Sequence, residues 1–262
     1  MCAAGSLRIP ASGLALVWAL SLSAQSTLEP GGSCQVAGRV ISYTTLREAD
    51  VLWERRVWRT IDLQEKTNLP FLLPQAQVNG CLGLLGVIRH GLLDEGAITA
   101  YDPGSLGKDD GFRVPFDTEA VRKILSGLDT LAPNAVSRFT IKEDWIFDKQ
   151  RSVMEVRIIG LAPMVEVRGE DGELRGHRPL FWLYFPECRT LFARWLAARQ
   201  EDGDPVSYEG LFASRRFSST IIKVSNMQDR MIDEHRTGLD ALLESEAIRQ
   251  QLLHMGFDLW NY

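Results

Sequence analysis

The spacing of apolar side chains predicts three helices in the first half of the chain. The first covers about 15 residues behind a Thr-x-x-Glu capping box, and an apolar side chain returns at every fourth position from Ala49 to Ile61. Residues 82–92 and 117–128 carry similar stripes, and the second of these opens with residues that favour helix N-termini. We therefore expect amphipathic helices in all three segments.

From residue 137 the pattern changes to that of a β-sheet. Residues 137–147 and 153–167 are rich in strand-forming side chains, and a polar turn at 148–151 separates them. Residues 179–185 (PLFWLYF) are apolar enough for a third strand that is buried on both faces. A further short strand is expected at 97–101. These segments predict an antiparallel sheet.

The remaining chain returns to helical spacing. We expect helices at 189–198, at 208–217 and at 237–255, the last ending at Gly256 with an apolar stripe that includes Leu239, Leu242, Leu243, Ile248 and Leu252. Helices precede and follow the sheet, which favours an α+β fold over a regular alternation of strands and helices. The expected architecture is an antiparallel sheet of three or more strands, at about 137–186, packed by N-terminal and C-terminal helices.

The N-terminus has the layout of a secretory signal peptide. Residues 13–24 (GLALVWALSLSA) form an apolar run that follows Arg8 and ends in small residues, with cleavage expected near Ala24. A membrane-spanning helix needs about 20 apolar residues, so this run is too short to span. The alternative is a buried N-terminal helix. The predicted organisation is a signal peptide at 1–24, an extended arm at 25–43 and a single α+β domain at 44–262.

Composition and cysteine content narrow the class further. The 262 residues are 45% hydrophobic and 24% charged, which is typical of a folded globular protein. The formal net charge of −5 argues against a nucleic-acid-binding domain. Without the leader the chain keeps Cys34, Cys81 and Cys188, an odd number, so at least one thiol stays free or pairs with a partner. Whether any of them forms a disulfide stays open.

Motifs for catalysis, cofactors or metals are not evident. The four histidines lack metal-ligand spacing, and no nucleophile-elbow motif occurs. The segment around Lys108 fails as a phosphate loop, because Asp102 stands at the first glycine position and Asp109 follows the lysine. We expect no catalytic residues, no cofactor and no metal. The rival hypothesis is an exported hydrolase or carbohydrate-binding domain that uses aromatic platforms with the carboxylate pairs Glu143/Asp144 and Asp148/Glu155.

Several long stretches resemble one family. They are LREADVLWERRVWRTIDLQEKTNLP at 46–70, KEDWIFDKQRSVMEVRIIGLAPM at 142–164 and PLFWLYFPECR at 179–189. FSSTIIKVSN at 217–226 and LDALLESEAIR at 239–249 follow in the same order, before the closing DLWNY. Together they resemble the gliding-motility N protein family, GldN/PorN, of the type IX secretion system.

The resemblance implies a non-enzymatic structural subunit in the periplasm, peripheral to the outer membrane. It implies that the chain joins the outer-membrane lipoprotein of the same system, the K protein, in a large ring, and that the ring contacts the periplasmic part of the inner-membrane M protein. Identical subunits around a closed circle need head-to-tail contacts.

The family supplies no catalytic residues, so interface residues are inferred from residue type alone. Aromatic and arginine side chains dominate interface hot spots, because they bury a large area and keep a polar tip. On the faces that we expect to point outward, the candidates for partner contacts are Arg55, Arg56, Trp58, Trp145, Asp148 and Arg151.

Overall fold

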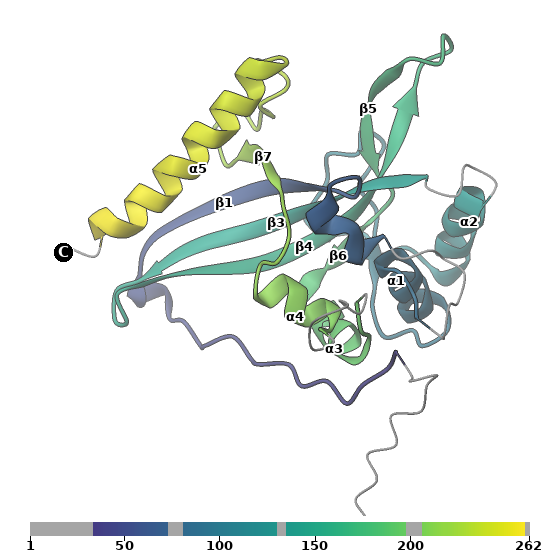
Figure 1. The fold of residues 1–262 in the computed structure, drawn as a ribbon, viewed down its shortest axis with the longest axis horizontal. Coiled ribbons are helices and arrows are strands. Elements are labelled where there is room, and N and C mark those ends of the chain that lie inside the picture. The colour runs from purple at the N-terminus through teal and green to yellow at the C-terminus, as the bar shows by residue number, and fades with distance from the viewer. Residues whose placement is uncertain (1–33, 73–80, 130–134, 198–205, 260–262) are drawn as a thin grey trace, which may run out of the picture. The chain divides into compact units, whose positions relative to one another are not determined.

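Three long antiparallel strands form the centre of the fold in the computed structural model (Figure 1). They are β1 (Val51–Asp62), β3 (Val136–Asp148) and β4 (Val153–Arg168). The structure describes residues 34–72, 81–129, 135–197 and 206–259. The predicted signal peptide and the first part of the predicted arm lie outside these residues.

Four shorter strands complete one antiparallel sheet. They are β2 (Ala100–Tyr101), β5 (Leu174–Pro179), β6 (Trp182–Tyr184) and β7 (Thr220–Val224). The strand order is β2-β6-β4-β3-β1-β7. Strand β5 lies outside this order and pairs with β4 after the part of β4 that pairs with β6. The predicted antiparallel sheet and the α+β class are confirmed.

Helices pack against this sheet from both halves of the chain. They are α1 (Leu84–Leu93), α2 (Thr118–Asp129), α3 (Phe185–Arg194), α4 (Tyr208–Ala213) and α5 (Leu239–Leu259), with short 3-10 turns η1 (Glu48–Asp50) and η2 (Lys66–Phe71). The largest core cluster joins sheet residues such as Phe139 and Leu161 to Leu84, Leu125 and Phe212 of the helices. The predicted cap of α2 is present, because the Asp117 carboxylate accepts a hydrogen bond from the Ala120 amide at 2.6 Å.

The prediction of a helix behind the Thr-x-x-Glu box is wrong, because this segment forms strand β1. A spacing of four residues places side chains on one face of a helix, but it also places them on one face of a strand, whose period is two. Val57 and Trp58 are both buried, since β1 lies between β3 and β7 and both faces of the sheet are covered here. Charged residues such as Arg55 and Arg59 stand between the stripe residues, so the strand shows no simple alternation of apolar and polar positions. The four-residue spacing alone could therefore not separate the two structures.

Several predicted boundaries also change. The strand expected at 179–185 is divided between the end of β5 and β6, and Phe185 already begins α3, with Pro186 in its first turn. This helix begins before the predicted 189 and ends at Arg194, and α4 ends before 217. The short strand at 97–101 shrinks to β2. Helix α5 continues through Gly256 to Leu259 rather than ending at the glycine.

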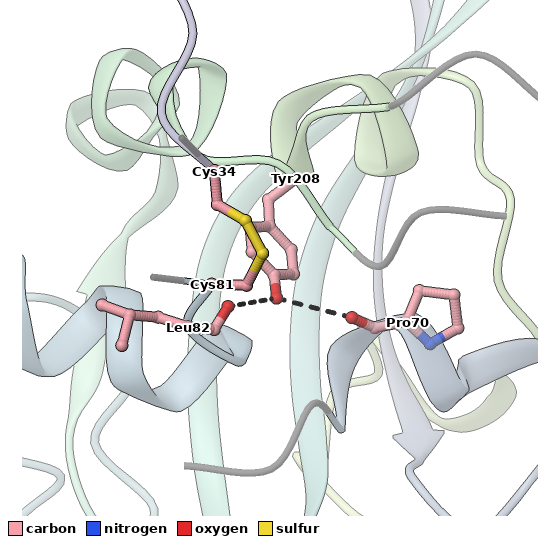
Figure 2. The surroundings of a disulfide bond; sticks show 5 residues. All are labelled: Cys34, Pro70, Cys81, Leu82 and Tyr208. Carbon is pink, nitrogen blue, oxygen red and sulfur yellow. Dashed lines mark hydrogen bonds between the residues drawn. A yellow bond between two sulfur atoms is a disulfide. The ribbon is translucent and has the colours of Figure 1, made fainter. Parts of the chain in front are cut away.

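A disulfide joins the N-terminal segment to the start of the helical layer (Figure 2). Cys34 and Cys81 are bonded across a sequence separation of 47 residues, and Cys188 is buried and free. Beside the bond, the Tyr208 hydroxyl donates to the carbonyl oxygen of Leu82 at 2.9 Å (Figure 2). The expectation that at least one thiol stays free is confirmed.

The segment between Cys34 and β1 runs over the domain without forming a helix or strand until η1. Arg189 donates to the carbonyl oxygen of Ile41 at 2.7 Å, and Arg157 donates to that of Thr44 at 2.6 Å. The Tyr43 ring lies 4.1 Å from the Arg189 guanidinium. The described part of the arm is thus held against the domain by arginine contacts.

Candidate interaction surface

Helix α5 rests on the sheet through one side only. Leu252 is buried in a cluster with Val57, Trp145, Ile221 and Ile232. The Ser245 hydroxyl oxygen accepts a hydrogen bond from the Ile221 amide at 3.0 Å. Because β7 is an edge strand, this contact satisfies a backbone donor that no further strand would pair. Figure 1 shows α5, in yellow, as the outer element beside β7.

The outward side of α5 carries large apolar side chains. A helix turns about 100° per residue, so positions separated by three, four and seven residues share one side. Five such side chains are exposed by between 44% and 71% of their surface: Leu239, Leu242, Leu243, Leu253 and Phe257. We call them the α5 stripe.

A fixed negative charge lies in the middle of the α5 stripe. Glu246 accepts hydrogen bonds from Arg249 at 2.7 and 2.8 Å and from the Gln250 amide at 2.8 Å. These hydrogen bonds, the one from Arg249 first, lower the pKa of Glu246 to about 2. The carboxylate is therefore charged at every physiological pH, and it gives the apolar side of the helix one polar position that a partner must match.

An apolar side of this kind points to an interface. Monomeric proteins rarely leave clustered large apolar side chains in water, and a larger patch rimmed by polar groups is typical of protein contacts. The sequence placed Leu239, Leu242 and Leu243 in one stripe with Ile248 and Leu252. The structure separates the two sets, because 248 and 252 fall on the opposite side of the helix. The two sets lie at different angles around the helix axis, and this difference was the signal in the sequence that could have separated them.

The outward placement predicted for the interface candidates is correct for the three arginines and wrong for the three other residues. Arg55 is exposed. Arg56 and Arg151 each keep 40% of the side chain exposed, while Arg56 binds Asp144 and Arg151 binds Asp148 and Glu155. Trp58 and Trp145 are 8% exposed and Asp148 is 5% exposed. Trp145 packs in the cluster with Leu252 of α5, and Trp58 packs in the cluster with Trp182 and Phe112, which explains why both aromatic side chains are buried. A partner contact at these six positions stays a prediction.

The buried candidates have polar partners within the chain. The Trp58 indole N–H donates to Asp110 at 2.6 Å, and the Trp145 indole N–H donates to Glu143 at 3.2 Å. Asp148 accepts from the Arg151 guanidinium at 2.6 Å and from the backbone amides of the hairpin turn. The Arg151 hydrogen bond is the main reason why the pKa of Asp148 is lowered. These contacts stabilise the β3–β4 hairpin and the sheet.

Neither carboxylate pair of the hydrolase hypothesis faces a substrate cleft as a pair. Glu143 and Asp144 point to opposite faces of β3, where Arg215 binds Glu143 at 2.7 Å and Arg56 binds Asp144 at 2.6 and 2.8 Å. Asp148 and Glu155 share Arg151 between them. Within the described ranges, His, Cys, Asp and Glu side chains do not gather in threes as a metal site requires.

A comparison with known protein families identifies one family. A family model described as "Gliding motility associated protein GldN" matches residues 46–261. No curated protein matches the chain. The match begins near η1 and runs through all strands of the sheet and through α5.

Proposed function

The chain belongs to the GldN family of gliding motility associated proteins, and on this premise we propose that it is a non-enzymatic structural subunit of a ring in the periplasm. Family membership makes it a component of the gliding motility and type IX secretion machinery. The proposal adds that the ring is associated with the outer membrane, and that the chain binds the K lipoprotein and the inner-membrane M protein.

Two features support a location outside the cytoplasm. The Cys34–Cys81 disulfide suits an oxidising compartment, since cytosolic thiols are kept reduced. The leader at 1–24, with cleavage near Ala24, would deliver the chain to the periplasm. No helix among the described residues has the length and apolar character to cross a membrane. We propose that the protein is peripheral to the outer membrane.

The observation that carries the assembly proposal is the α5 stripe. A closed ring of identical chains needs a surface on each copy that fits a different surface on the next copy. The α5 stripe offers an apolar contact area, and Glu246 within it restricts how a neighbour can dock. We assign the stripe to the contact with the next copy. Arg55, Arg56 and Arg151, whose side chains reach solvent, remain candidates for contacts with the K or M protein.

The test compares a variant with substitutions in the α5 stripe with a variant that has substitutions elsewhere on the surface. The double variant Leu243→Ser and Phe257→Ser should abolish secretion through the machinery and surface gliding, because it removes the apolar contact without opening the core. The matched control is Leu69→Ser with Met227→Ser, which changes two apolar side chains outside α5 that are also more than half exposed.

Both proteins should accumulate to the wild-type level and give the wild-type circular dichroism spectrum. Loss of secretion in the control as well, or full secretion in the stripe variant, would contradict the assignment of the stripe.

A further inference from the structure

A pocket of about 400 Å³ lies between α5 and the segment that leads into β7. Arg59 of β1 lines it together with Phe217 and residues 218–221. Helix α5 supplies the other lining residues, which are Leu242, Ser245, Glu246 and Arg249. We call it the Arg59 pocket. It adjoins the α5 stripe, because Leu242 belongs to both.

Arg59 is a buried charge that no carboxylate neutralises. The residue is only 9% exposed. Its Nε–H donates to the Ser219 hydroxyl oxygen at 2.9 Å, and Nη2 donates to the Ser219 carbonyl oxygen at 3.2 Å. Both acceptors are neutral, and no Asp or Glu among the described residues forms an ion pair with this guanidinium. A buried charge without a counter-charge is costly, so an anion that enters the pocket would be stabilised here.

The neighbouring charged side chains leave this positive charge unbalanced. Glu143 is bound by Arg215 at 2.7 Å, and Glu246 is bound by Arg249 at 2.7 Å. Burial first, and then Arg215 and Arg249, lower the pKa of Arg59, while Glu143 raises it. An arginine stays protonated in spite of such a shift. Three arginines therefore face two carboxylates that are already paired, and the remaining positive charge lies on Arg59.

The free donors of Arg59 are accessible from the pocket. A guanidinium carries five N–H groups, and two of them are used by Ser219. Nη1 has no partner among the described residues, yet it is not one of the buried polar atoms that are closed off from solvent. The Ser219 hydroxyl accepts from Arg59, so its own proton remains for an acceptor in the pocket. Donors from both residues can thus reach one bound group.

A carboxylate fits these donors better than a phosphate does. Nη1 and Nη2 present two parallel N–H groups, and a carboxylate accepts both with its two oxygens. Only one positive charge is unbalanced, and the carboxylate of Glu246 also lines the pocket. It would repel a dianion such as phosphate more strongly than a single negative charge. The charge of the pocket therefore favours a monoanion.

The rim of the pocket indicates that the carboxylate belongs to a polypeptide. Leu242 lines the pocket and is 57% exposed. A small free acid would leave this side chain in water, whereas a polypeptide could cover it with an apolar residue beside its acidic one. The volume is at the small end of the roughly 300–1,000 Å³ that ligand pockets span, which suits one or two side chains.

We propose that the Arg59 pocket binds the carboxylate of an Asp or Glu side chain from a polypeptide that packs over the α5 stripe. Nη1 and Nη2 of Arg59 donate to the two carboxylate oxygens, the Ser219 hydroxyl donates to one of them, and Leu242 contacts an apolar neighbour of the acidic residue. In the ring this polypeptide is the next copy of the chain, and that identification alone rests on the proposed function.

The test follows the arginine Nε–H signals of the ¹⁵N-labelled full-length mature protein by nuclear magnetic resonance. The probe is the capped peptide acetyl-Leu-Glu-Leu-amide, and its matched control has Gln in place of Glu. Sodium acetate and inorganic phosphate are added separately at the same ionic strength. Arg59→Lys assigns the signal of Arg59. Arg56, whose Nε–H donates to Asp144 at 2.6 Å, is the internal reference.

The Glu peptide should shift the Arg59 signal saturably and leave that of Arg56 unchanged. The Gln peptide should bind at least tenfold more weakly, because it lacks the charge, and acetate at least fivefold more weakly, because it lacks the apolar neighbours. Equal binding of the two peptides, binding of acetate or phosphate as tight as that of the Glu peptide, or no shift of Arg59 would overturn the proposal.

Two variants of exposed residues test the charge and the rim separately. Glu246→Gln should tighten binding of the Glu peptide about twofold to fivefold, because it removes a negative charge from the lining. Leu242→Ser should weaken the Glu peptide about threefold to tenfold and leave acetate unchanged. Weaker binding by Glu246→Gln, or an equal effect of Leu242→Ser on both ligands, would contradict the proposal. If Arg59→Lys does not fold, the Arg59 signal is assigned through its own backbone amide.

Failure of this inference is distinguishable from failure of the proposed function. Absence of peptide binding would overturn the pocket and leave circular particles from cell envelopes unaffected. A chain that binds the Glu peptide as expected but is recovered from envelopes as a lone monomer would retain the pocket and lose the ring.

Discussion

At the scale of single residues, the buried carboxylates of the sheet are stabilised by arginines that bind them. Glu143 is fully buried, with its carboxylate held by Arg215 and by the Trp145 indole. Adjacent residues of a strand point to opposite faces, so Glu143 and Asp144 take different partners. Arg215 lies 72 residues from Glu143, and Arg56 lies 88 residues from Asp144. Partners so distant in the sequence cannot be read from local pattern, and neither could the burial of Trp58 and Trp145.

Removing the partner of Glu143 should destabilise the fold strongly. Arg215→Met leaves a buried carboxylate without its counter-charge, and we expect the free energy of unfolding to fall by about 3 kcal/mol. Urea unfolding followed by tryptophan fluorescence measures the change. Arg216→Met, which alters the exposed neighbouring arginine, should change it by less than about 0.5 kcal/mol. Equal stabilities of the two variants would show that the Arg215–Glu143 pair is unimportant.

At the scale of elements, local pattern predicted the helices that pack by one side and the long strands β3 and β4, but it failed for β1 and for the bounds of the third predicted strand. Helices α1 and α2 present one apolar side to the core, and their predicted ranges are nearly right. Strand β1 was mistaken for a helix, because its apolar positions four residues apart also fit a strand. The third strand was predicted too long, because the apolar run PLFWLYF crosses from β6 into α3.

The two sides of α5 should respond differently to truncation. Leu252 is 2% exposed and Leu253 is 44% exposed, so the two adjacent leucines test the core side and the stripe separately. Leu252→Ala should lower the free energy of unfolding by about 2–4 kcal/mol through lost burial and a cavity. Leu253→Ala should leave stability within about 0.5 kcal/mol of wild type. Thermal and urea unfolding measure both, and a large loss for Leu253→Ala would place that residue in the core instead.

The disulfide should stabilise the link between the N-terminal segment and α1. In the chain-entropy account, a bridge that closes 47 residues contributes about 4 kcal/mol. Replacing Cys34 and Cys81 together by Ser should therefore lower the midpoint of urea unfolding. A reductant should do the same to the wild type and nothing further to the double variant. A reductant that affects both proteins equally would show that the effect does not come from this bond.

At the scale of the whole molecule, the α+β class was predictable because it depends on the order of helical and strand segments. The family was recognisable from long irregular strings, and the family match over 46–261 agrees with them. The interaction surface was harder to predict from the sequence. Which leucines of α5 face water depends on how the helix lies on β7. The account that results is a domain with a covered sheet and one apolar helix side left for a neighbour.

The central claim is that this chain is built into a ring, and purification of the tagged mature protein from solubilised cell envelopes tests it most directly. Mass spectrometry identifies the proteins that come with it, and negative-stain electron microscopy shows their shape. The account predicts circular particles that contain an outer-membrane lipoprotein of the same machinery, and their loss with the Leu243→Ser and Phe257→Ser variant. Recovery of the wild-type chain as a lone folded monomer would contradict the account.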